Sequence, residues 1–464
     1  MTGIELPRLA AAGATLAAYT WVCLRAWRRQ RPASASPTAT GAAETANSVV
    51  LVAYASQSGC AHELAEETAE ALRNGGVTAQ LLPLAELSSA RLQAGTPVLF
   101  LVSTCGEGDA PDNAARFVEQ CMGHPLPLDG VQYGLLALGD RRYRHYCGFG
   151  RRLDAWLQDN GAQALFPRVE LDQANADSLQ QWRHQVANVA GLAELAELPE
   201  AAQPAPGFWH LRARHRLNPG SVGHAVFQVE LEAVAGADRD APRRPTPDWQ
   251  AGDLLQLYLP GQDEAPRAYS IASLPGDGAV QLLVRAIAGP DGQPGRMSSL
   301  LCDTAQPGTV LRGRLRAHHN FRIGDNHDRP LILIGNGTGL AGLMAHLRQR
   351  AAQGDGRNWL VFGERHAAHD DFCGEELDAL MQADLLARCD RVFSRDAPAG
   401  EYVQHRLQRA ADSLREWVAG GAAIYVCGNA VGMGPAVHQT LIDALGAGTV
   451  RQLTDSGRYR RDIY

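Results

Sequence analysis

Three apolar runs, each followed by a loop of small and polar residues, constrain the fold of this chain more than any other feature of its sequence. They are "SVVLVAYAS", "PVLFLVS" and "VQYGLLALGD", and a segment with helical spacing follows the first of them. Continuous apolar runs are typical of parallel strands that are buried on both faces. The loops after such strands meet at the carboxyl edge of the sheet. The pattern therefore predicts a doubly wound α/β domain with a ligand site where the three loops converge.

The first of these loops, Ser56 to Cys60, offers hydroxyl groups and a glycine directly before a predicted helix. Backbone N–H groups and the helix dipole at such a position favour a phosphate group. The loop contains no G-x-x-x-x-G-K pattern, which argues against a nucleotide triphosphatase. A serine-rich turn on its own is only a helix cap. Three loops in register on successive strands favour a ligand site instead.

A second kind of pattern begins near residue 207, where short or alternating apolar runs are bounded by glycine and proline. This spacing predicts an antiparallel barrel. Within it, "RAYSIAS" (267–273) places Arg267 and Tyr269 on one face of a strand and Ser270 on the other. In "GRMSSLL" (295–301), a glycine at a helix start allows close approach to a pyrophosphate. Each motif alone is also consistent with a routine strand or helix start.

A third pattern, "RPLILIGNGTGLAGLMAHLRQR", is a buried strand that runs through G-x-G-x-G into a helix. Glycines at these positions permit the tight turn and the close backbone contact that a dinucleotide requires. The motif is weak evidence by itself. The segments "WLVFGERH", "RVFSRD", "EYVQHRL" and "IYVCGNAVGMG" follow it in that order and strengthen the interpretation.

Taken together, these motifs resemble those of the diflavin reductases, the family that includes cytochrome P450 reductase and the flavoprotein subunit of sulfite reductase. The resemblance extends from Ser48 to Tyr464. It implies a flavodoxin-like parallel sheet, then a ferredoxin reductase-like module with an antiparallel FAD barrel and an α/β NADP-binding domain. It also implies FMN, FAD and NADPH as cofactors. One departure is large: only "GQDEAP" stands where the family has a helical connecting domain.

By resemblance, residues Ser56 to Gly59 hold the FMN phosphate, the loop 103–108 lines one face of the flavin ring, and Tyr143 stacks on the other. Cys60 and Cys105 stand where the family has asparagine and, in some members, tyrosine. The FMN residues implied by the family motifs are Ser56, Gln57, Ser58, Gly59, Cys60, Ser103, Thr104, Cys105, Gly106, Glu107, Gly108, Gly139, Asp140, Tyr143, Tyr146 and Cys147.

The reductase module carries two further sets of residues by the same resemblance. In the FAD set, Arg267 binds the pyrophosphate and Tyr269 stacks on the ring; the whole set is Arg267, Tyr269, Ser270, Gly295, Arg296, Met297, Ser298 and Tyr464. In the NADP set, Ser394 and Arg395 bind the 2′-phosphate; the whole set is Gly335, Gly337, Thr338, Gly339, Arg365, Ser394, Arg395, Tyr402 and Gln404. Gly400 stands where the family often has lysine, which weakens the expected preference for NADPH over NADH.

The same family places four residues at the point of hydride transfer. Ser270, Cys427 and Asp462 match the groups that stabilise positive charge on the nicotinamide, and Tyr464 matches the aromatic residue that covers the FAD ring. Without the resemblance, Cys427 is an ordinary small core residue and the last residues are an ordinary surface tail.

The N-terminus differs from the rest of the chain. Residues Leu9 to Leu24 carry no charge, and "RAWRRQR" follows them, an order that favours a membrane anchor with its following domains in the cytoplasm. A disordered or signal-like leader is the alternative. The expected segments are an anchor (1–31), a flexible linker (32–47), the FMN domain (48–190), a second linker (191–206), the FAD barrel (207–325) and the NADP-binding domain (326–464).

Composition limits the remaining classes of function. The formal net charge of −7, with arginine as the only strongly basic residue type, argues against nucleic acid as a partner. Nine scattered cysteines without a C-x-x-C pair give no support for a metal site. Arg141, Arg142 and Arg144 surround Tyr143; they are either a solvated cluster or a docking surface for an acidic acceptor.

The sequence thus predicts an NADPH-dependent flavoprotein reductase at the inner (cytoplasmic) membrane, held by a single span. Its electrons would pass from NADPH to FAD to FMN and then to a one-electron acceptor protein with a haem or an iron–sulfur centre. A ferric-siderophore or quinone reductase is the alternative within enzymes. A non-catalytic, membrane-tethered flavin-binding protein that docks a partner is the alternative outside them.

Overall fold

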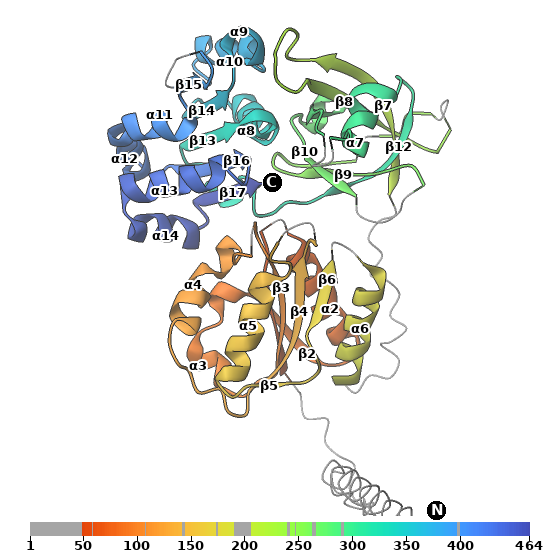
Figure 1. Ribbon diagram of the computed structural model, residues 1–464, viewed down its shortest axis with the longest axis vertical. Coiled ribbons are helices and arrows are strands. Elements are labelled where there is room, and N and C mark those ends of the chain that lie inside the picture. Colours follow the sequence, from red (N-terminus) through yellow and green to blue (C-terminus); the bar gives the residue numbers. More distant parts are fainter. Residues whose placement is uncertain are drawn as a thin grey trace, which may run out of the picture. The chain divides into compact units, whose positions relative to one another are not determined.

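The computed structural model describes residues 49–57, 59–106, 108–141, 144–172, 175–189, 206–238, 242–245, 247–261, 266–288, 292–396 and 400–464 (Figure 1). The predicted anchor and first linker, residues 1–47, lie outside these ranges, as does nearly all of the second linker. In the ranges that are described, no helix combines the length and the apolar character that crossing a bilayer requires.

The first sheet is parallel, with strand order β2-β1-β3-β4-β5 and with β6 paired to β4. Its strands are β1 (Val49–Ala55), β2 (Thr78–Pro83), β3 (Val98–Ser103), β4 (Gln132–Gly139), β5 (Gln163–Ala164) and β6 (Val169–Asp172). The helices around it are α2 (Cys60–Asn74), α3 (Ser89–Leu92), α4 (Ala115–Phe117), α5 (Gly148–Asp159) and α6 (Ala176–Val189).

Both faces of this sheet are covered, because its strands are apolar on both sides. Phe149 and Leu153 of α5 pack in one buried cluster, and Ala61 of α2 and Trp182 of α6 pack in another. The doubly wound fold predicted from the three apolar runs is therefore confirmed, and its strand order is that of flavodoxin.

The second sheet is antiparallel, with strand order β10-β9-β12-β7-β8-β11. A bridge between Ile271 and Leu282 joins its two ends and closes it into the predicted barrel. Its strands are β7 (Gly207–Arg216), β8 (Val226–Val234), β9 (Leu254–Tyr258), β10 (Arg267–Ser270), β11 (Val280–Arg285) and β12 (Val310–Arg316), and the short helix α7 (Arg296–Ser299) follows β11.

No connecting domain interrupts the barrel. The strands β9 and β10 pair antiparallel, with Leu257 opposite Arg267 and Leu254 opposite Ser270, and only residues 259–266 join them. The short "GQDEAP" segment thus connects two neighbouring strands of one sheet. The strand that carries the FAD motif is held by its own sheet neighbour.

The third sheet is parallel, with strand order β15-β14-β13-β16-β17. Its strands are β13 (Leu331–Asn336), β14 (Asn358–Glu364), β15 (Arg388–Phe393), β16 (Ala423–Gly428) and β17 (Tyr459–Ile463). Its helices are α8 (Leu340–Ala352), α9 (Ala367–Asp370), α10 (Gly374–Gln382), α11 (Val403–Arg409), α12 (Ala411–Ala419), α13 (Met433–Leu445) and α14 (Ala447–Asp455).

The chain ends in this sheet. The strand β17 pairs parallel with β16, with Asp462 opposite Cys427, and Tyr459 at its start is buried in the core. The resemblance implied that Tyr464 covers a flavin and that Asp462 stabilises positive charge on the nicotinamide, without a structural reason for their positions. The pairing adds a physical reason for the position of the last residues, because backbone hydrogen bonds fix their register.

A buried histidine on α8 predicts a pH dependence of stability. His346 is fully buried and packs between Phe321 and Tyr425, with ring centroids 5.1 and 5.0 Å away. Burial lowers its pKa to about 3. Since the unfolded side chain has a higher pKa, near 6.5, protons favour the unfolded chain, and the stabilisation present above pH 6.5 is lost as pH falls towards 3.

Replacing His346 by Phe should therefore weaken the fall of the unfolding midpoint between pH 7 and pH 5, by roughly half. The effect is partial because burial also lowers the pKa of neighbouring His318. Thermal unfolding of both proteins across this range measures it. An unchanged pH slope in a variant that folds normally would contradict the assignment.

Candidate functional site

The three predicted FMN loops lie at the carboxyl ends of β1, β3 and β4, which are neighbours in the first sheet. In the first loop, Ser56 is buried, and its Oγ accepts a hydrogen bond from the Ala61 backbone at 3.2 Å. Gly59 precedes α2 with a φ of 91°, a left-handed conformation that favours glycine. Cys60 is the first residue of α2. The loop thus forms the helix start expected for a phosphate, and Ser58 lies outside the described residues.

Gln57 links this loop to two other parts of the chain. Its side chain donates to Asp112 Oδ2 at 3.0 Å and to the Arg461 carbonyl at 3.2 Å, and its Oε1 accepts from the Asp112 backbone at 3.0 Å. Arg461 in turn donates from Nε to Asp112 Oδ2 at 2.7 Å. Residue 461 directly precedes Asp462, so one strand contacts the first FMN loop and carries a predicted hydride-transfer residue.

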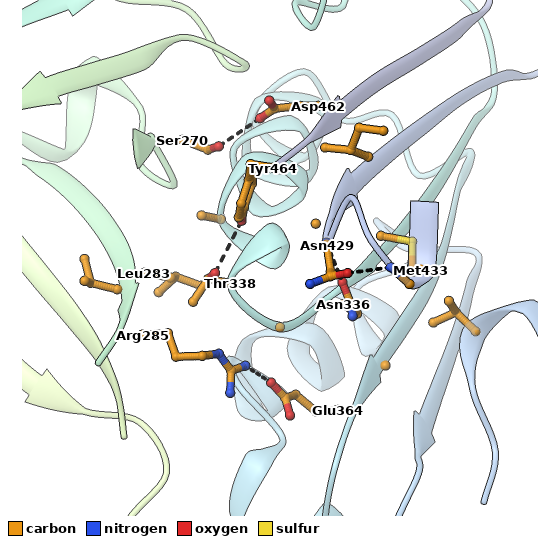
Figure 2. Close-up of a pocket in the computed structure, with 18 of the residues that line it drawn as sticks. Ser270, Leu283, Arg285, Asn336, Thr338, Glu364, Asn429, Met433, Asp462 and Tyr464 are labelled. Atoms are coloured by element: carbon orange, nitrogen blue, oxygen red, sulfur yellow. Dashed lines mark hydrogen bonds and ion pairs between the residues drawn. The ribbon is translucent and has the colours of Figure 1, made fainter. Parts of the chain in front are cut away.

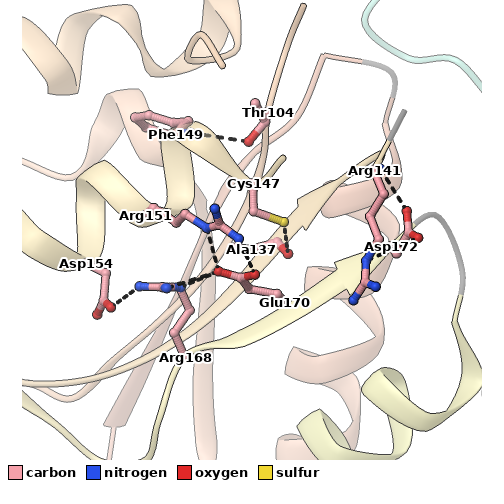
Figure 3. Close-up of polar contacts among 10 residues, drawn as sticks. All are labelled: Thr104, Ala137, Arg141, Cys147, Phe149, Arg151, Asp154, Arg168, Glu170 and Asp172. Atoms are coloured by element: carbon pink, nitrogen blue, oxygen red, sulfur yellow. Dashed lines mark hydrogen bonds and ion pairs between the residues drawn. The ribbon is translucent and has the colours of Figure 1, made fainter. Parts of the chain in front are cut away.

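The second loop is a tight turn. Cys105 and Asp109 bond each other through their backbones at 2.9 and 2.8 Å, and Gly106 and Gly108 have positive φ angles. Burial raises the pKa of the Cys105 thiol to about 12, so the side chain is neutral at physiological pH. Thr104 Oγ1 accepts a hydrogen bond from the Phe149 backbone at 3.3 Å, which ties this loop to α5 (Figure 3). Ser103 ends β3, and Glu107 lies outside the described residues.

The third loop follows Gly139 and Asp140 and returns to α5. Cys147 precedes this helix, is fully buried, and donates from Sγ to the Ala137 carbonyl at 3.2 Å (Figure 3). Its thiol therefore serves the packing of α5 on β4. Tyr146 has a buried hydroxyl, and the Arg141 guanidinium lies 5.3 Å from its ring centroid. Tyr143 lies outside the described residues.

Apart from Tyr464, the predicted FAD residues lie on β10 and at the start of and within α7 of the barrel. Arg267, Tyr269 and Ser270 are on β10, and burial raises the pKa of Tyr269. Gly295 precedes α7, and Ser298 within this helix donates to the Gly295 carbonyl at 3.0 Å. Arg296 and Met297 occupy the two positions between them, and Met297 is buried.

The predicted dinucleotide turn follows β13. Gly337 has a φ of 58°, and a Cβ on Gly339 would lie 2.3 Å from the Cys427 carbonyl oxygen. A Cβ on Gly335 would lie 2.7 Å from Leu343. The glycines are required here because the turn packs directly on β16 and α8.

One cavity of about 1060 Å³ joins the FAD and NADP residues. Its lining includes Arg267, Tyr269 and Ser270 from the barrel and the turn residues Gly337 and Thr338. Further predicted residues that line it are Ser298, Arg365, Ser394, Arg395, Tyr402, Gln404, Asp462 and Tyr464. Gly295, Arg296, Met297, Gly335, Gly339 and Cys427 are not among the lining residues.

Two of the predicted hydride-transfer residues, Ser270 and Asp462, meet in the wall of this cavity (Figure 2). Ser270 Oγ donates to Asp462 Oδ2 at 2.9 Å, and Cys427 Sγ lies 3.7 Å from the same oxygen. Burial, with the Asp462 charge, raises the pKa of the Cys427 thiol well above its usual value. The thiol is therefore a neutral donor, and Asp462 is the negative group that can face a developing positive charge.

Tyr464 lies beside this cluster. Its hydroxyl is 3.3 Å from Thr338 Oγ1, and its backbone bonds Gly428 and Ala430 at 3.0 Å (Figure 2). The side chain is 53% exposed, so it lies against the dinucleotide turn while still open to the cavity. This is a position from which an aromatic ring can cover a flavin and be displaced.

The loop after β15 and the start of α11 contribute four further lining residues to the cavity, Ser394, Arg395, Tyr402 and Gln404. Arg395 is exposed and Tyr402 is 45% exposed, as expected for groups that receive a ligand from solvent. Gly400 has a φ of 61°, which a lysine would adopt only with strain. The chain thus has a conformational reason for glycine at this position.

These residues fit the three implied cofactors. The cavity carries residues of the expected FAD set from the barrel and of the expected NADP set from the third sheet. Separately, the first loop of the first sheet forms a helix start of the kind that favours a phosphate group. Among the described residues, no cluster of histidine, cysteine, aspartate or glutamate could hold a metal ion.

Several residues of the site were not predicted from the sequence. Arg285 and Glu364 line the same cavity and form an ion pair, and Asn336 Oδ1 accepts from the Asn429 backbone at 3.1 Å. Arg461 contacts the first FMN loop. Asn336 and Glu364 stand inside the quoted segments, but at positions to which the sequence analysis gave no role. Each residue of this set acquires its role through contacts between distant segments. The positions of Asn336 and Glu364 at strand ends are the one available signal.

Two family profiles match the chain. The flavodoxin profile matches residues 52–184, and the profile of the oxidoreductase NAD-binding domain matches residues 333–439. These ranges contain the FMN loops and most of the third sheet, respectively.

Three similar proteins from bacteria are each named sulfite reductase [NADPH] flavoprotein alpha-component. The relative from Vibrio cholerae is 27% identical, over 91% of this chain and 88% of its own length. The relative from Bacillus subtilis is 25% identical, over 93% of this chain and 92% of its own length. The relative from Neisseria meningitidis is 26% identical, over 97% of this chain and 96% of its own length. The Vibrio alignment runs over 543 positions, more than the 464 residues of this chain, so that relative contains insertions.

The cluster around Asp462 predicts a specific defect. Replacing Asp462 by Asn keeps its shape and its bond to Ser270 but removes the negative charge. Because charge stabilisation acts in the transition state, flavin reduction by NADPH should slow about 100-fold while NADP⁺ affinity changes little. Anaerobic stopped-flow absorbance at saturating NADPH measures this rate.

The matched control is Asp455→Asn, which removes a carboxylate from the exposed end of α14 in the same domain. Its rate should equal that of the unaltered chain. If both variants reduced the flavin at the same rate, Asp462 would have no part in hydride transfer.

Proposed function

We propose that this chain, which resembles the diflavin reductases over nearly all of its length, carries electrons from NADPH through FAD to FMN and on to a one-electron acceptor protein. The predicted family, the enzyme class of NADPH-dependent flavoprotein reductases and the cofactors FMN, FAD and NADPH are confirmed by the comparisons. The identity of the acceptor and the site residues are the proposed parts.

The observation that carries the proposal is the cavity that joins Ser270 and Asp462 to Ser394 and Arg395. A nicotinamide dinucleotide that binds its 2′-phosphate at Arg395 would extend along this cavity. Its reactive ring would then reach the Ser270–Asp462 pair. Arginine is suited to a phosphate dianion because it offers several donors in a fixed plane.

In the proposed reaction, Arg267 and the start of α7 would hold the flavin pyrophosphate, and Tyr269 would orient the ring. Tyr464 would cover the ring in the absence of the nicotinamide. Asp462, held in place by Ser270 at 2.9 Å, would face the positive charge that grows on the nicotinamide. The flavins supply the conversion of a two-electron hydride into single electrons.

Transfer from FAD to FMN is supported by the position of Arg461. This residue bonds Asp112 and accepts from Gln57 of the first FMN loop, and its neighbour Asp462 lies at the hydride-transfer cluster. The strand β17 therefore contacts the first FMN loop through the Arg461 backbone and contributes the Asp462 side chain to the hydride-transfer cluster. Short separation between the two sites is what electron transfer requires.

The proposed acceptor is a protein with a haem or an iron–sulfur centre. The similar proteins are named as the flavoprotein alpha-component of sulfite reductase, a name that points to a further component and supports a separate acceptor protein. We further propose that residues 1–31 anchor the chain at the inner membrane with its catalytic domains in the cytoplasm. Fractionation of cells that express the chain with and without residues 1–47 tests the anchor: equal distribution of both forms would reject it.

Anaerobic titration with NADPH tests the function itself. The flavin absorbance should bleach within seconds, and cytochrome c added afterwards should be reduced without further NADPH. Bleaching of only the FAD fraction would indicate a ferric-siderophore or quinone reductase that does not use the first domain in series. A flavin that stays oxidised would favour a non-catalytic docking protein.

The arginines near the third FMN loop predict how the acceptor docks. Arg141 and Arg144 are exposed, although Arg141 also pairs with Asp172 at 3.6 Å (Figure 3). Changing Arg141, Arg142 and Arg144 to Glu should slow reduction of an acidic iron–sulfur protein about tenfold at low salt. Reduction of cytochrome c, a basic protein, should not slow. Stopped-flow measurement of both reduction rates at several salt concentrations tests this prediction. An unchanged rate with the acidic acceptor would show that these arginines do not form its docking surface.

A further inference from the structure

A cation of the barrel lies at the start of the first helix of the FMN domain. Arg316 is the last residue of β12, and its Nη2 lies 3.2 Å from the position that a Cβ on Gly59 would take. Gly59 directly precedes α2, in the loop that we expect to bind the FMN phosphate. The Arg316 side chain is only 6% exposed, so it is enclosed at this loop and does not extend into solvent.

The first domain supplies no cation of its own in this loop. The loop 56–60, "SQSGC", contains neither lysine nor arginine. A phosphate monoester carries a charge of about −1.5 to −2 at pH 7, whereas a helix N-terminus offers the equivalent of only about half a positive charge. By the family resemblance Cys60 stands in place of asparagine, and a thiol is a weaker donor than an amide. A guanidinium group at this point supplies both charge and N–H donors that the loop lacks.

The position of Arg316 is electrostatically unfavourable unless anions are present. The N-terminus of a helix is the positive end of its dipole, so a buried cation is repelled there. Glu63, in the first turn of α2, accepts a hydrogen bond from Arg316 Nε at 2.9 Å and offsets one positive charge. Its side chain is 32% exposed, however, and solvent screens part of this attraction. A phosphate group beside Nη2 would provide a second and stronger neutralising charge.

The same barrel segment also fixes the backbone of the loop. Asn320 Nδ2 donates to the carbonyl oxygens of Ser56 and Gln57 at 2.8 and 3.2 Å. Because peptide groups are planar, holding these carbonyls also sets the direction of the N–H groups on the other side of the same peptides. The segment itself is anchored, since the His318 backbone donates to Asp253 Oδ1 at 2.9 Å and both residues are buried.

We propose that Arg316 binds the phosphate of FMN and that Asn320 positions the phosphate loop, so that the barrel completes the FMN site. Binding of FMN and docking of the first domain on the barrel then stabilise each other, because a ligand that contacts both parts favours the arrangement in which they meet. The inference rests on one part of the proposed function, namely that FMN occupies the loops of the first sheet. Arg316 also lines the cavity that carries the FAD residues, so one side chain borders both proposed flavin sites.

FMN and riboflavin differ only in the phosphate, so their affinities separate this role from a structural one. The full chain is depleted of flavin and resupplied with FAD, so that the barrel is occupied. Titration with FMN or riboflavin, followed by flavin fluorescence, then gives the two Kd values. The thermal midpoint and the FAD content are measured first. A variant of Arg316 that loses FAD and keeps its affinity for FMN would place this residue in the FAD site and overturn the inference.

Replacing Arg316 by Gln should raise the Kd of FMN about 10- to 100-fold and leave the Kd of riboflavin unchanged, because a charge-assisted contact to the phosphate is lost. Arg316→Lys, which keeps a cation, should lose less. Asn320→Ala should raise the Kd of FMN about fivefold, since the loop loses its support but keeps the cation.

Glu63→Gln separates phosphate binding from a simple ion pair between the domains. It removes a negative charge from the phosphate loop, so FMN should bind with unchanged or higher affinity. An ion pair that only docks the first domain on the barrel would instead make Glu63→Gln and Arg316→Gln equivalent.

Arg312→Gln is the matched control, because Arg312 lies four residues earlier on the same strand and is exposed. It should change neither Kd. Three results would overturn the inference: an unchanged Kd of FMN in Arg316→Gln, equal losses for FMN and riboflavin, or equal losses of FMN affinity in Arg316→Gln and Glu63→Gln.

The outcome also distinguishes this inference from the proposed function. If the unaltered chain takes up FAD but binds neither FMN nor riboflavin, the assignment of FMN to the first domain fails, and the proposed electron path fails with it. If the unaltered chain binds FMN tightly and Arg316→Gln binds it equally well, the FMN assignment stands and only the contact with Arg316 is wrong.

Discussion

The hydrogen bond between Ser270 and Asp462 joins the second and third sheets, although the two residues are 192 positions apart in the sequence. It forms because β17 pairs parallel with β16 in one register, which sets Asp462 opposite Cys427 and turns its carboxylate towards β10 of the barrel. A shift of one residue along β17 would direct Asp462 to the opposite face of the sheet. The cavity, the donor set around Asp462 and the place of Tyr464 all depend on this register.

The fold was predictable because its signals are local. The three apolar runs and their loops, the alternating strands of the barrel and the glycine turn each identify one element and the element after it. The meeting of Ser270, Cys427 and Asp462 was predictable only through resemblance to a family, since no local pattern links them. The pair between Arg285 and Glu364 has no local signal either, because two domains supply its members. Cys147 shows the reverse case: it lies in a motif, yet its thiol bonds Ala137 and packs α5 on the sheet.

The short connection between β9 and β10 differs from the family pattern, in which a helical connecting domain stands at this point. The relatives align over more positions than this chain possesses, and the two strands that flank "GQDEAP" pair directly with each other. Without a connecting domain, the link between the flavodoxin-like domain and the barrel depends on the second linker and on side-chain contacts. Arg461 with Asp112, and Arg316 with Glu63 at 2.9 Å, are two such contacts. Both pair an arginine of the reductase part with a carboxylate of the first domain.

The central claim is that one chain holds two different flavins, one in the loops of the first sheet and one in the barrel. Release of the flavins by heat from the purified full chain, followed by chromatographic quantification against protein concentration, tests it most directly. The account predicts one FMN and one FAD per chain. A preparation with a full complement of a single flavin species, which does not take up the other when it is supplied, would contradict it.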